Sequence, residues 1–162
     1  MHLSENEFLE LIAKEQNIIH KICRIYENDE SSRKDLFQEI SIQLWRSYPS
    51  FKGKSKFTSW MYRVGLNTAI SLYRKNKRVI QGTEYTEIYE FKAEEEYDNT
   101  RDLQINWLYE KIGSFSEIEK ALIFLYLEDK KYIEISETLG ISEVNARVKI
   151  SRLKIKLKAM LK

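Results

Sequence analysis

The stretch Ser50–Arg78 reads SFKGKSKFTSWMYRVGLNTAISLYRKNKR, and the rest of the chain is organised around it. It begins as a loop that holds Gly53 and three lysines, continues in a long helical pattern and ends in a basic run. Aromatic residues stand between the cations. Because cations can follow nucleic-acid phosphates while rings stack on unpaired bases, this stretch is typical of a surface that binds single-stranded nucleic acid.

Two stripes are expected along the helix in this stretch, because residues three or four apart share one helix face. One stripe holds Trp60, Val64, Asn67 and Ser71, and the other holds Tyr62, Leu66, Ala69 and Tyr73. The Asn67 amide can donate and accept, so it could read a base edge in a site whose other wall is the loop 51–55. The alternative makes Asn67 a satisfied polar residue and the aromatics core, because apolar stripes usually mean burial. Periodicity alone leaves both open.

The composition predicts an all-helical globular protein. The 162 residues are 43% hydrophobic and 32% charged, with only 5 Gly and 1 Pro, and alternating strand-like runs are nearly absent. Cys23 is the only cysteine and two scattered histidines accompany it, so neither a disulfide framework nor a metal site is expected. No apolar run approaches the roughly 20 residues of a membrane span, and the N-terminus is polar and acidic. We therefore expect a cytoplasmic protein without membrane insertion, cofactor or small-molecule substrate.

The charges are unevenly distributed along the chain. Residues 1–80 hold 14 Lys/Arg and 9 Asp/Glu, residues 81–128 hold 4 and 12, and residues 129–162 hold 9 and 4. The net charges are therefore +5, −8 and +5, which fits two contacts with a polyanion. Residues 79–98 carry seven acids against Lys92 without a period, so we predict two helical domains, 1–80 and 101–162, joined by a flexible acidic linker, 81–100.

The first domain is expected to contain two helices ahead of the central stretch. Ser4 and Glu7 fit a capping box that opens the first helix, in which a break near Lys14 is considered. Ser32 with Asp35 marks the start of the second, which should stop at Pro49. The second helix has an apolar stripe and a separate face with Asp35, Gln38, Glu39 and Ile42. That face is either plainly solvated or docks on a basic partner.

The second domain carries the pattern of a helix-turn-helix. Ser116 and Glu119 form a further capping box. A short helix from Tyr132 to Leu139 then runs into Gly140, and Ser142 caps a long basic helix. In this last helix the predicted core stripe is Ala146, Ile150, Leu153 and Leu157, and the opposite stripe is Val144, Val148, Ser151 and Ile155. Flanking cations suit major-groove reading, whereas the alternative is a basic helix packed on a protein partner.

These two halves, in this order, resemble the bacterial sigma-70 family of RNA polymerase sigma factors, in its extracytoplasmic-function class. In the first half the resemblance rests on DLFQE…LWRSYPSFKGKSKFTSWMYRVGLNTAISLYRKNKR, and in the second on KKYIEISETLGIS with the basic helix after it. It covers nearly the whole chain. One departure is Phe115-Ser116, where the family usually has Leu-Pro before the first helix of the second domain.

The resemblance implies a promoter-specificity subunit that binds core RNA polymerase and helps to melt the −10 element, without catalysis of its own. Its expected partners are the β′ clamp helices and the β flap of the polymerase, promoter DNA and an anti-sigma factor. The expected polymerase-binding residues are Asp35, Gln38, Glu39 and Ile42. The expected −10 residues are Phe51, Lys52, Gly53, Lys54, Ser55, Lys56, Trp60, Arg63, Asn67, Arg74 and Lys75. The expected −35 residues are Ser142, Asn145, Arg147, Val148, Lys149, Ser151, Arg152 and Lys154.

Two other functions are alternatives to this interpretation. A one-component helix-turn-helix regulator that binds duplex DNA would need only the last helix and would leave the central stretch unexplained. A nuclease would need a cluster of carboxylates or histidines for a metal or a general base. The acids concentrate in the expected linker rather than beside the basic helix, so the nuclease is disfavoured.

Overall fold

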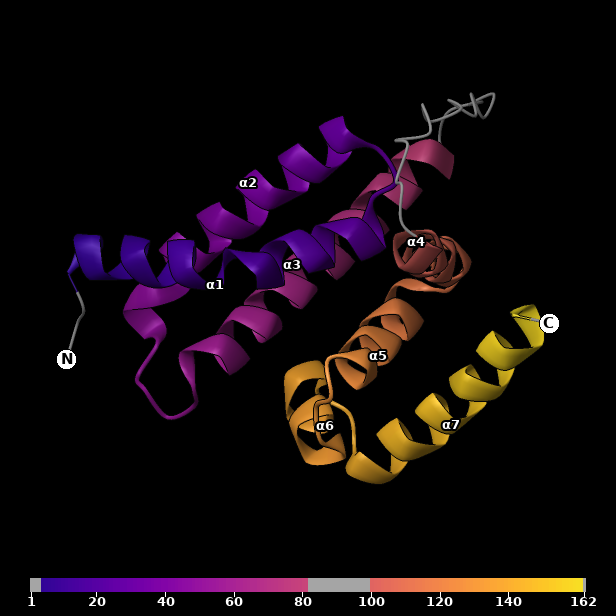
Figure 1. Ribbon diagram of the computed structural model, residues 1–162. Coiled ribbons are helices and arrows are strands. Elements are labelled where there is room, and N and C mark those ends of the chain that lie inside the picture. The colour runs from indigo at the N-terminus through magenta and orange to yellow at the C-terminus, as the bar shows by residue number, and fades with distance from the viewer. Residues whose placement is uncertain (1–3, 82–99, 162) are drawn as a thin grey trace.

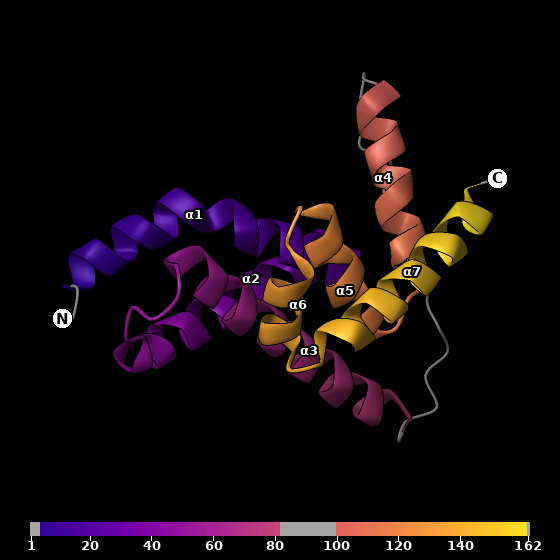
Figure 2. The same cartoon turned by 90° about the horizontal axis from the view of Figure 1, so that it is seen from below.

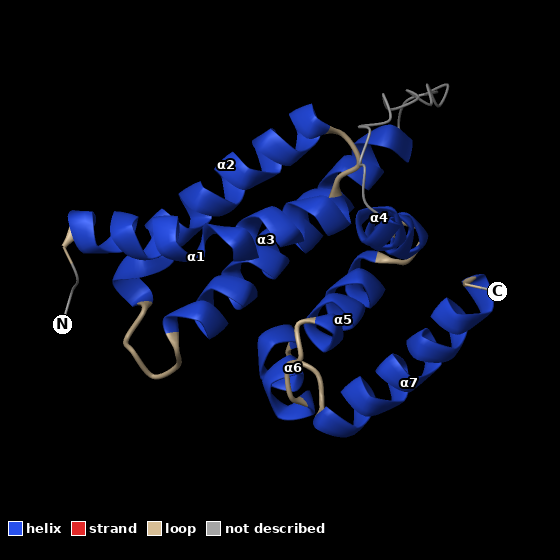
Figure 3. Cartoon of the chain, viewed as in Figure 1, coloured by secondary structure: helices blue, strands red, loops and turns tan. Residues whose placement is uncertain are grey.

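The computed structural model describes residues 4–81 and 100–161, and every regular element in these two ranges is a helix (Figures 1 and 3). The all-α prediction is thus confirmed. The expected acidic linker falls almost entirely in residues 82–99, which lie outside the described residues.

The first half is built from three long helices: α1 (Glu5–Tyr26), α2 (Glu30–Ser47) and α3 (Phe57–Gln81), with a short 3-10 turn, η1 (Tyr48–Ser50), after α2. The capping box of Ser4 and Glu7 is present, as predicted. Two local predictions were wrong. Helix α1 runs through Lys14 without a break, and α2 begins before Ser32 because the Asp29 side chain accepts the Ser32 N–H at 2.8 Å and so acts as the N-cap.

The three helices of the first half enclose an apolar core. Its centre is made of fully buried side chains from each helix, among them Ile22, Ile40, Leu44 and Leu66. Helix α3 packs closely on the other two at Gly65, where an added Cβ would lie 2.8 Å from Ile22 Cδ1 and 3.6 Å from Ile40 Cγ2. The glycine is therefore required by space rather than by backbone conformation.

The second half contains α4 (Thr100–Ile112), α5 (Glu117–Leu127), α6 (Tyr132–Leu139) and α7 (Glu143–Met160). Both predicted caps are present: Ser116 with Glu119 opens α5, and the Ser142 hydroxyl accepts the Asn145 N–H at the start of α7. Gly140 ends α6 with φ of +69°, a left-handed conformation that glycine adopts without strain. Helices α6 and α7 and their turn form the predicted helix-turn-helix.

The two halves pack against each other (Figures 1 and 2). Helix α5 lies against α1 and α3, α6 lies against α3, and α4 crosses near the end of α1. The Tyr62 ring of α3 packs on Phe124 of α5 with a centroid separation of 5.9 Å. The buried residues of both halves form one connected cluster at this junction.

Several chemical possibilities can be checked across residues 4–81 and 100–161. In this part of the chain no helix is both long and apolar enough to cross a membrane, and no group of three or more His, Cys, Asp or Glu side chains could hold a metal ion. Cys23 is a free, buried thiol. Burial raises the pKa of that thiol to about 12, so it stays protonated near neutral pH.

Candidate nucleic-acid interface

The loop 51–56 presents its lysines to solvent and is anchored by aromatic side chains. Lys52, Lys54 and Lys56 are exposed, as are Ser55 and Gly53. Gly53 has φ of +72°, which explains a glycine at the tip of the loop. The half-buried Phe51 ring lies 5.1 Å from the Trp60 ring and 5.9 Å from the Phe57 ring, and Tyr48 also contacts Trp60. Trp60 is half-buried and anchors the loop through its contact with the Phe51 ring.

The two stripes of α3 differ in burial. Tyr62, Leu66 and Ala69 are buried, so this stripe is core, whereas Asn67 and Ser71 are exposed on the other face. Part of that burial is due to the second half, because Tyr62 lies under Phe124 and donates its hydroxyl to Glu128 at 2.9 Å. The sequence left the choice of stripe open, since it does not reveal that a second half covers α3.

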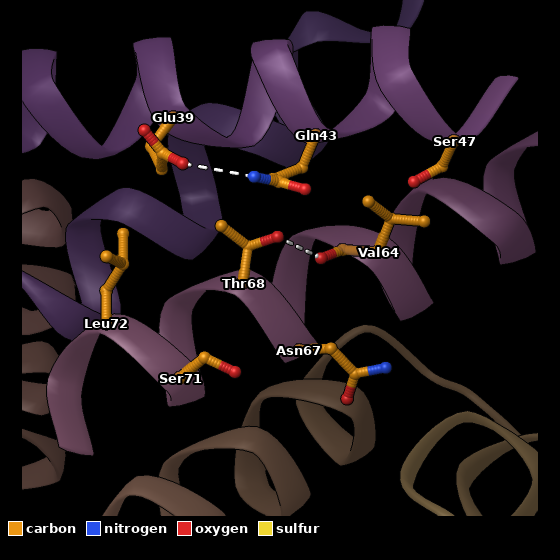
Figure 4. A pocket seen from close by; sticks show the side chains of 8 residues that line it. All are labelled: Glu39, Gln43, Ser47, Val64, Asn67, Thr68, Ser71 and Leu72. Carbon is orange, nitrogen blue, oxygen red and sulfur yellow. Dashed lines mark hydrogen bonds between the residues drawn. The ribbon is translucent and has the colours of Figure 1, made fainter. Parts of the chain in front are cut away.

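Asn67 lies in a groove of about 430 Å³ between α2 and α3 (Figure 4). The lining residues are Glu39, Gln43, Ser47, Val64, Asn67, Thr68, Ser71 and Leu72. Gln43 donates to the Glu39 carboxylate at 3.2 Å, which orients both side chains on the α2 wall. The loop 51–55, expected as the other wall, does not line this groove. The groove joins one residue of the expected polymerase face, Glu39, with one of the expected −10 residues, Asn67.

The expected polymerase face on α2 points largely to solvent. Asp35, Gln38 and Ile42 are exposed, and Glu39 is half-buried. One further apolar side chain extends this face: Trp45, one turn after Ile42, is 46% exposed. The Trp45 ring is held edge-on against Phe8 at 5.2 Å. Sequence reasoning missed Trp45, although its position three residues after Ile42 places it on the same side of the helix.

The basic end of α3 is partly engaged by the second half. Arg63, Arg74 and Lys75 are all exposed on α3. Arg74 Nε donates to Glu117 of α5 at 2.9 Å, so its guanidinium already has a carboxylate partner. The hydrogen bond from Arg74 holds the pKa of Glu117 below its usual range, which keeps this carboxylate ionised. The lysines of the loop 52–56 are thus exposed, whereas Arg74 near the end of α3 is paired with α5.

Helix α7 separates its packing side from its outer side. The four predicted core residues, Ala146, Ile150, Leu153 and Leu157, are all buried. The opposite stripe is exposed, with Val144 at 72% and Ile155 at 68%. Exposed apolar patches often mark interaction sites, and these side chains would fit against thymine methyl groups in a major groove.

The polar residues expected to contact DNA on α7 differ in their surroundings. Asn145, Val148, Lys149, Ser151 and Arg152 are exposed. Ser142 is exposed too, but its hydroxyl already caps the helix. Arg147 is exposed and pairs with Glu143 at 2.8 Å over the Tyr132 ring. Lys154 is half-buried with its Nζ 5.0 Å from the Tyr126 ring, so it leans toward α5 rather than outward.

Family models match both halves of the chain. The model described as Sigma-70 region 2 matches residues 11–79, and the model described as Sigma-70, region 4 matches residues 105–157. The first model therefore covers all of α2, nearly all of α3 and α1 from residue 11, and the second covers α5 and α6 together with most of α4 and α7.

Curated relatives extend over most of the chain. The ECF RNA polymerase sigma factor SigW of Bacillus subtilis is 26% identical over 160 residues, which cover 91% of this chain and 85% of SigW. The RNA polymerase sigma factor SigZ of the same organism is 27% identical over 134 residues, which cover 83% of this chain and 75% of SigZ.

Two solved structures share the fold. The sigma factor RpoE in complex with the anti-sigma factor NepR from Bartonella quintana matches with a TM-score of 0.74 at 17% identity, over 96% of both chains. CnrH in complex with the cytosolic domain of CnrY matches with a TM-score of 0.70 at 19% identity, over 98% of this chain and 89% of CnrH. At these identities the likeness concerns the fold alone.

Proposed function

The chain belongs to the sigma-70 family of RNA polymerase sigma factors, in the extracytoplasmic-function class, and from this premise we propose how its residues share the work of a promoter-specificity subunit. Residues 1–80 act as the region 2 domain, which binds core polymerase and engages the −10 element. Residues 101–162 act as the region 4 domain, which reads the −35 element. The protein contributes binding and DNA melting and carries out no catalysis of its own.

The observation that carries this proposal is the division of surfaces among three helices. Helix α2 offers an outward face of carboxylates and apolar side chains. Helix α3 offers a polar groove and is preceded by a loop of exposed lysines, and α7 offers an exposed stripe flanked by cations. Carboxylates with apolar anchors suit a protein partner, whereas cations suit DNA. A one-component regulator would use α7 and leave the other two surfaces without a role.

The partners follow from these surfaces. We assign the α2 face, with Asp35, Gln38, Glu39 and Ile42, to the β′ clamp helices of core polymerase, and add Trp45 as an aromatic anchor. Trp45 is a residue type enriched at binding hot spots, and it lies partly exposed next to Ile42. The second half meets the β flap. An anti-sigma factor is a further expected partner, since RpoE was solved with one, and bacterial transcription places the protein in the cytoplasm.

The test is run-off transcription with purified core polymerase on fragmented genomic DNA, followed by mapping of the start sites. The protein should direct core polymerase to a small set of starts and should co-purify with it. The double variant Asp35→Lys/Glu39→Lys should lose both properties and keep its helical circular dichroism spectrum, because Asp35 is exposed and Glu39 half-buried at the helix surface. Glu5→Lys/Glu10→Lys, with the same charge change on exposed positions of α1, is the matched control. Binding of DNA as a dimer without core polymerase would instead support a one-component regulator.

A further inference from the structure

Lys120 is a charged residue buried between the two halves. It belongs to α5, is only 4% exposed, and places its Nζ 4.8 Å from the centroid of the Tyr73 ring and 5.6 Å from that of Tyr26. Both rings come from the first half. Burial lowers the pKa of Lys120 below its usual value, and the carboxylates of Glu27 and Glu117 partly offset this by favouring its charged form. A cation between two tyrosine rings fixes α5 on α1 and α3 in one place.

One helical turn before Lys120, Glu117 binds a residue expected to contact DNA. Its carboxylate accepts from Arg74 at 2.9 Å, and its backbone carbonyl accepts from the Tyr26 hydroxyl at 2.6 Å. Arg74 stands in the basic run of α3 and is one of the residues expected to contact DNA at the −10 element. Guanidinium groups recognise carboxylate and phosphate oxygens in the same way. Glu117 therefore occupies a position that a DNA phosphate would take.

A second contact between the halves lies at the other end of α5. Glu128 accepts from Lys21 of α1 and from the Tyr62 hydroxyl of α3, at 3.2 and 2.9 Å. Lys130 lies 4.6 Å from the Tyr62 ring. Arg24 adds a hydrogen bond to Asn106 and lies over the Tyr109 ring. Most of these contacts pair a charge with a ring or another charge, as in interfaces that open and close.

The closed arrangement does not fit a molecule that engages both promoter elements. Elements centred near −10 and −35 are about 25 base pairs apart, which is about 85 Å of duplex at 3.4 Å per pair. A compact chain of this length is roughly 40 Å across. The halves must therefore separate on the promoter, and the 18 residues between Gln81 and Thr100 allow about 60 Å when fully extended.

We propose that Arg74, Glu117 and Lys120 form an interdomain latch, in which Glu117 competes with nucleic-acid phosphates for Arg74, so that DNA bound at the basic end of α3 opens the molecule. The inference rests on the proposed function for the identity of the DNA, but not for the latch itself. Opening then couples the two halves: engagement of Arg74 by DNA frees α5 and, with it, the helix-turn-helix to reach upstream.

The latch can be measured without polymerase, by single-molecule energy transfer between dyes on the two halves. Ala13→Cys on α1 and Ala159→Cys on α7 replace exposed alanines and provide the attachment sites. The buried Cys23 should stay unlabelled because its thiol remains protonated. The parent protein should show a main population of high transfer, the closed form. A parent that is already mainly open at low salt would overturn the proposal.

A charge swap isolates the Arg74–Glu117 contact. Arg74→Glu and Glu117→Arg should each raise the ratio of open to closed molecules by at least about threefold, since each replaces a partly exposed ion pair with a repulsion. The double variant restores an ion pair and should return the ratio toward that of the parent. Glu110→Arg, with the same charge change at an exposed position of α4, should leave the ratio unchanged. The proposal would be contradicted if the two single variants left the ratio unchanged, as Glu110→Arg should. It would also be contradicted if the double variant were as open as the single variants.

Oligo(dT) then tests the competition, because a phosphate backbone is present in it without a promoter sequence. Titration with a 20-nucleotide strand should shift the parent to the open form. The charge-swapped double variant should need several times more strand, since its residue 74 repels phosphate. Equal responses of the two proteins would show that phosphate does not compete at Arg74. Failure in run-off transcription together with a normal latch would reject the proposed function and leave the latch standing.

Discussion

Gly65 shows how one missing side chain sets the distance between three helices. A Cβ at this position would lie 2.8 Å from Ile22 Cδ1, and Ile22 is fully buried. Gly65→Ala gains about 1 kcal/mol in helix propensity but overpacks the core at a cost of about 1–3 kcal/mol. We expect a net loss of stability, measured as a lower midpoint in urea unfolding.

The matched control for this substitution removes the atom that clashes. Ile22→Val deletes Cδ1 and alone should cost about 0.5–1.5 kcal/mol. If the clash is the cause, the double variant Gly65→Ala/Ile22→Val should be more stable than the sum of the two single effects predicts. Additive effects would show that the core relaxes around the new methyl group by another route.

Asn67 offers a prediction that separates melting from binding. In the groove between α2 and α3, its exposed amide can pair with a base only after the base leaves the duplex. Asn67→Ala should leave core binding unchanged and reduce open complexes about three- to tenfold, the value of one or two hydrogen bonds. Permanganate reactivity of unpaired thymines measures this, with Ser71→Ala in the same groove as control. Unchanged reactivity would make Asn67 a surface polar residue only.

At the scale of the element, α7 allows two kinds of DNA contact to be told apart. Arg152 and Lys149 are both exposed on this helix. Arg152→Ala should weaken binding to the upstream element by about 1–3 kcal/mol and relax specificity at one position. Lys149→Ala should weaken binding to all DNA sequences alike. It should also reduce the slope of log binding constant against log salt concentration by about one.

Fluorescence anisotropy of labelled duplexes over a salt series measures both effects. Lys154 is the comparison residue, because it leans on the Tyr126 ring and should contribute less than Lys149 to the salt slope. An Arg152→Ala protein with full sequence preference would assign that arginine to the backbone instead.

Much of the element structure could be predicted because it is encoded locally. The serine caps at Ser4, Ser116 and Ser142, the glycine after α6 and the core stripe of α7 each depend on residues within a few turns. The start of α2 was misplaced because Asp29, rather than Ser32, supplies the capping oxygen, and both residue types are good caps.

The candidate site was less predictable for a physical reason. The groove lined by Asn67 is completed by α2 rather than by the loop 51–55, and Tyr62 of the buried stripe packs on Phe124 of α5. Both facts depend on how helices distant in sequence pack, which helical periodicity within α3 does not specify. The predicted assignments of individual residues to polymerase and DNA therefore remain predictions.

At the scale of the whole molecule, the contact between Arg74 and Glu117 gives the closed form a dependence on pH. The hydrogen bond from Arg74 lowers the pKa of Glu117 from 4.5, and Lys77 and Lys120 add cations near the same carboxylate. A group with a lowered pKa in the closed form favours closure above its ordinary pKa. That contribution is lost as the pH falls through the lowered value.

The fraction of closed molecules should therefore hold steady near neutral pH and fall as the pH drops below about 4.5. Energy transfer between the dyes at positions 13 and 159 measures it. Burial raises the pKa of Glu27, so the protonation of Glu27 at low pH favours the closed form and opposes the effect of Glu117. Comparing the parent with Glu117→Gln therefore isolates the contribution of Glu117. If Glu117→Gln loses its closed form over the same pH range as the parent, other carboxylates cause the effect.

The separation of the two sides of α7 bears on how such proteins diversify. The buried side holds the helix in place, while Val144, Val148 and Ile155 lie on the exposed side and are not part of the core. Substitutions on the outer side therefore escape the purifying selection that acts on folding. After a gene duplication, one copy could acquire a new set of target genes through a few surface changes while both copies keep the same scaffold. In this architecture, a change of DNA target requires almost no loss of thermodynamic stability.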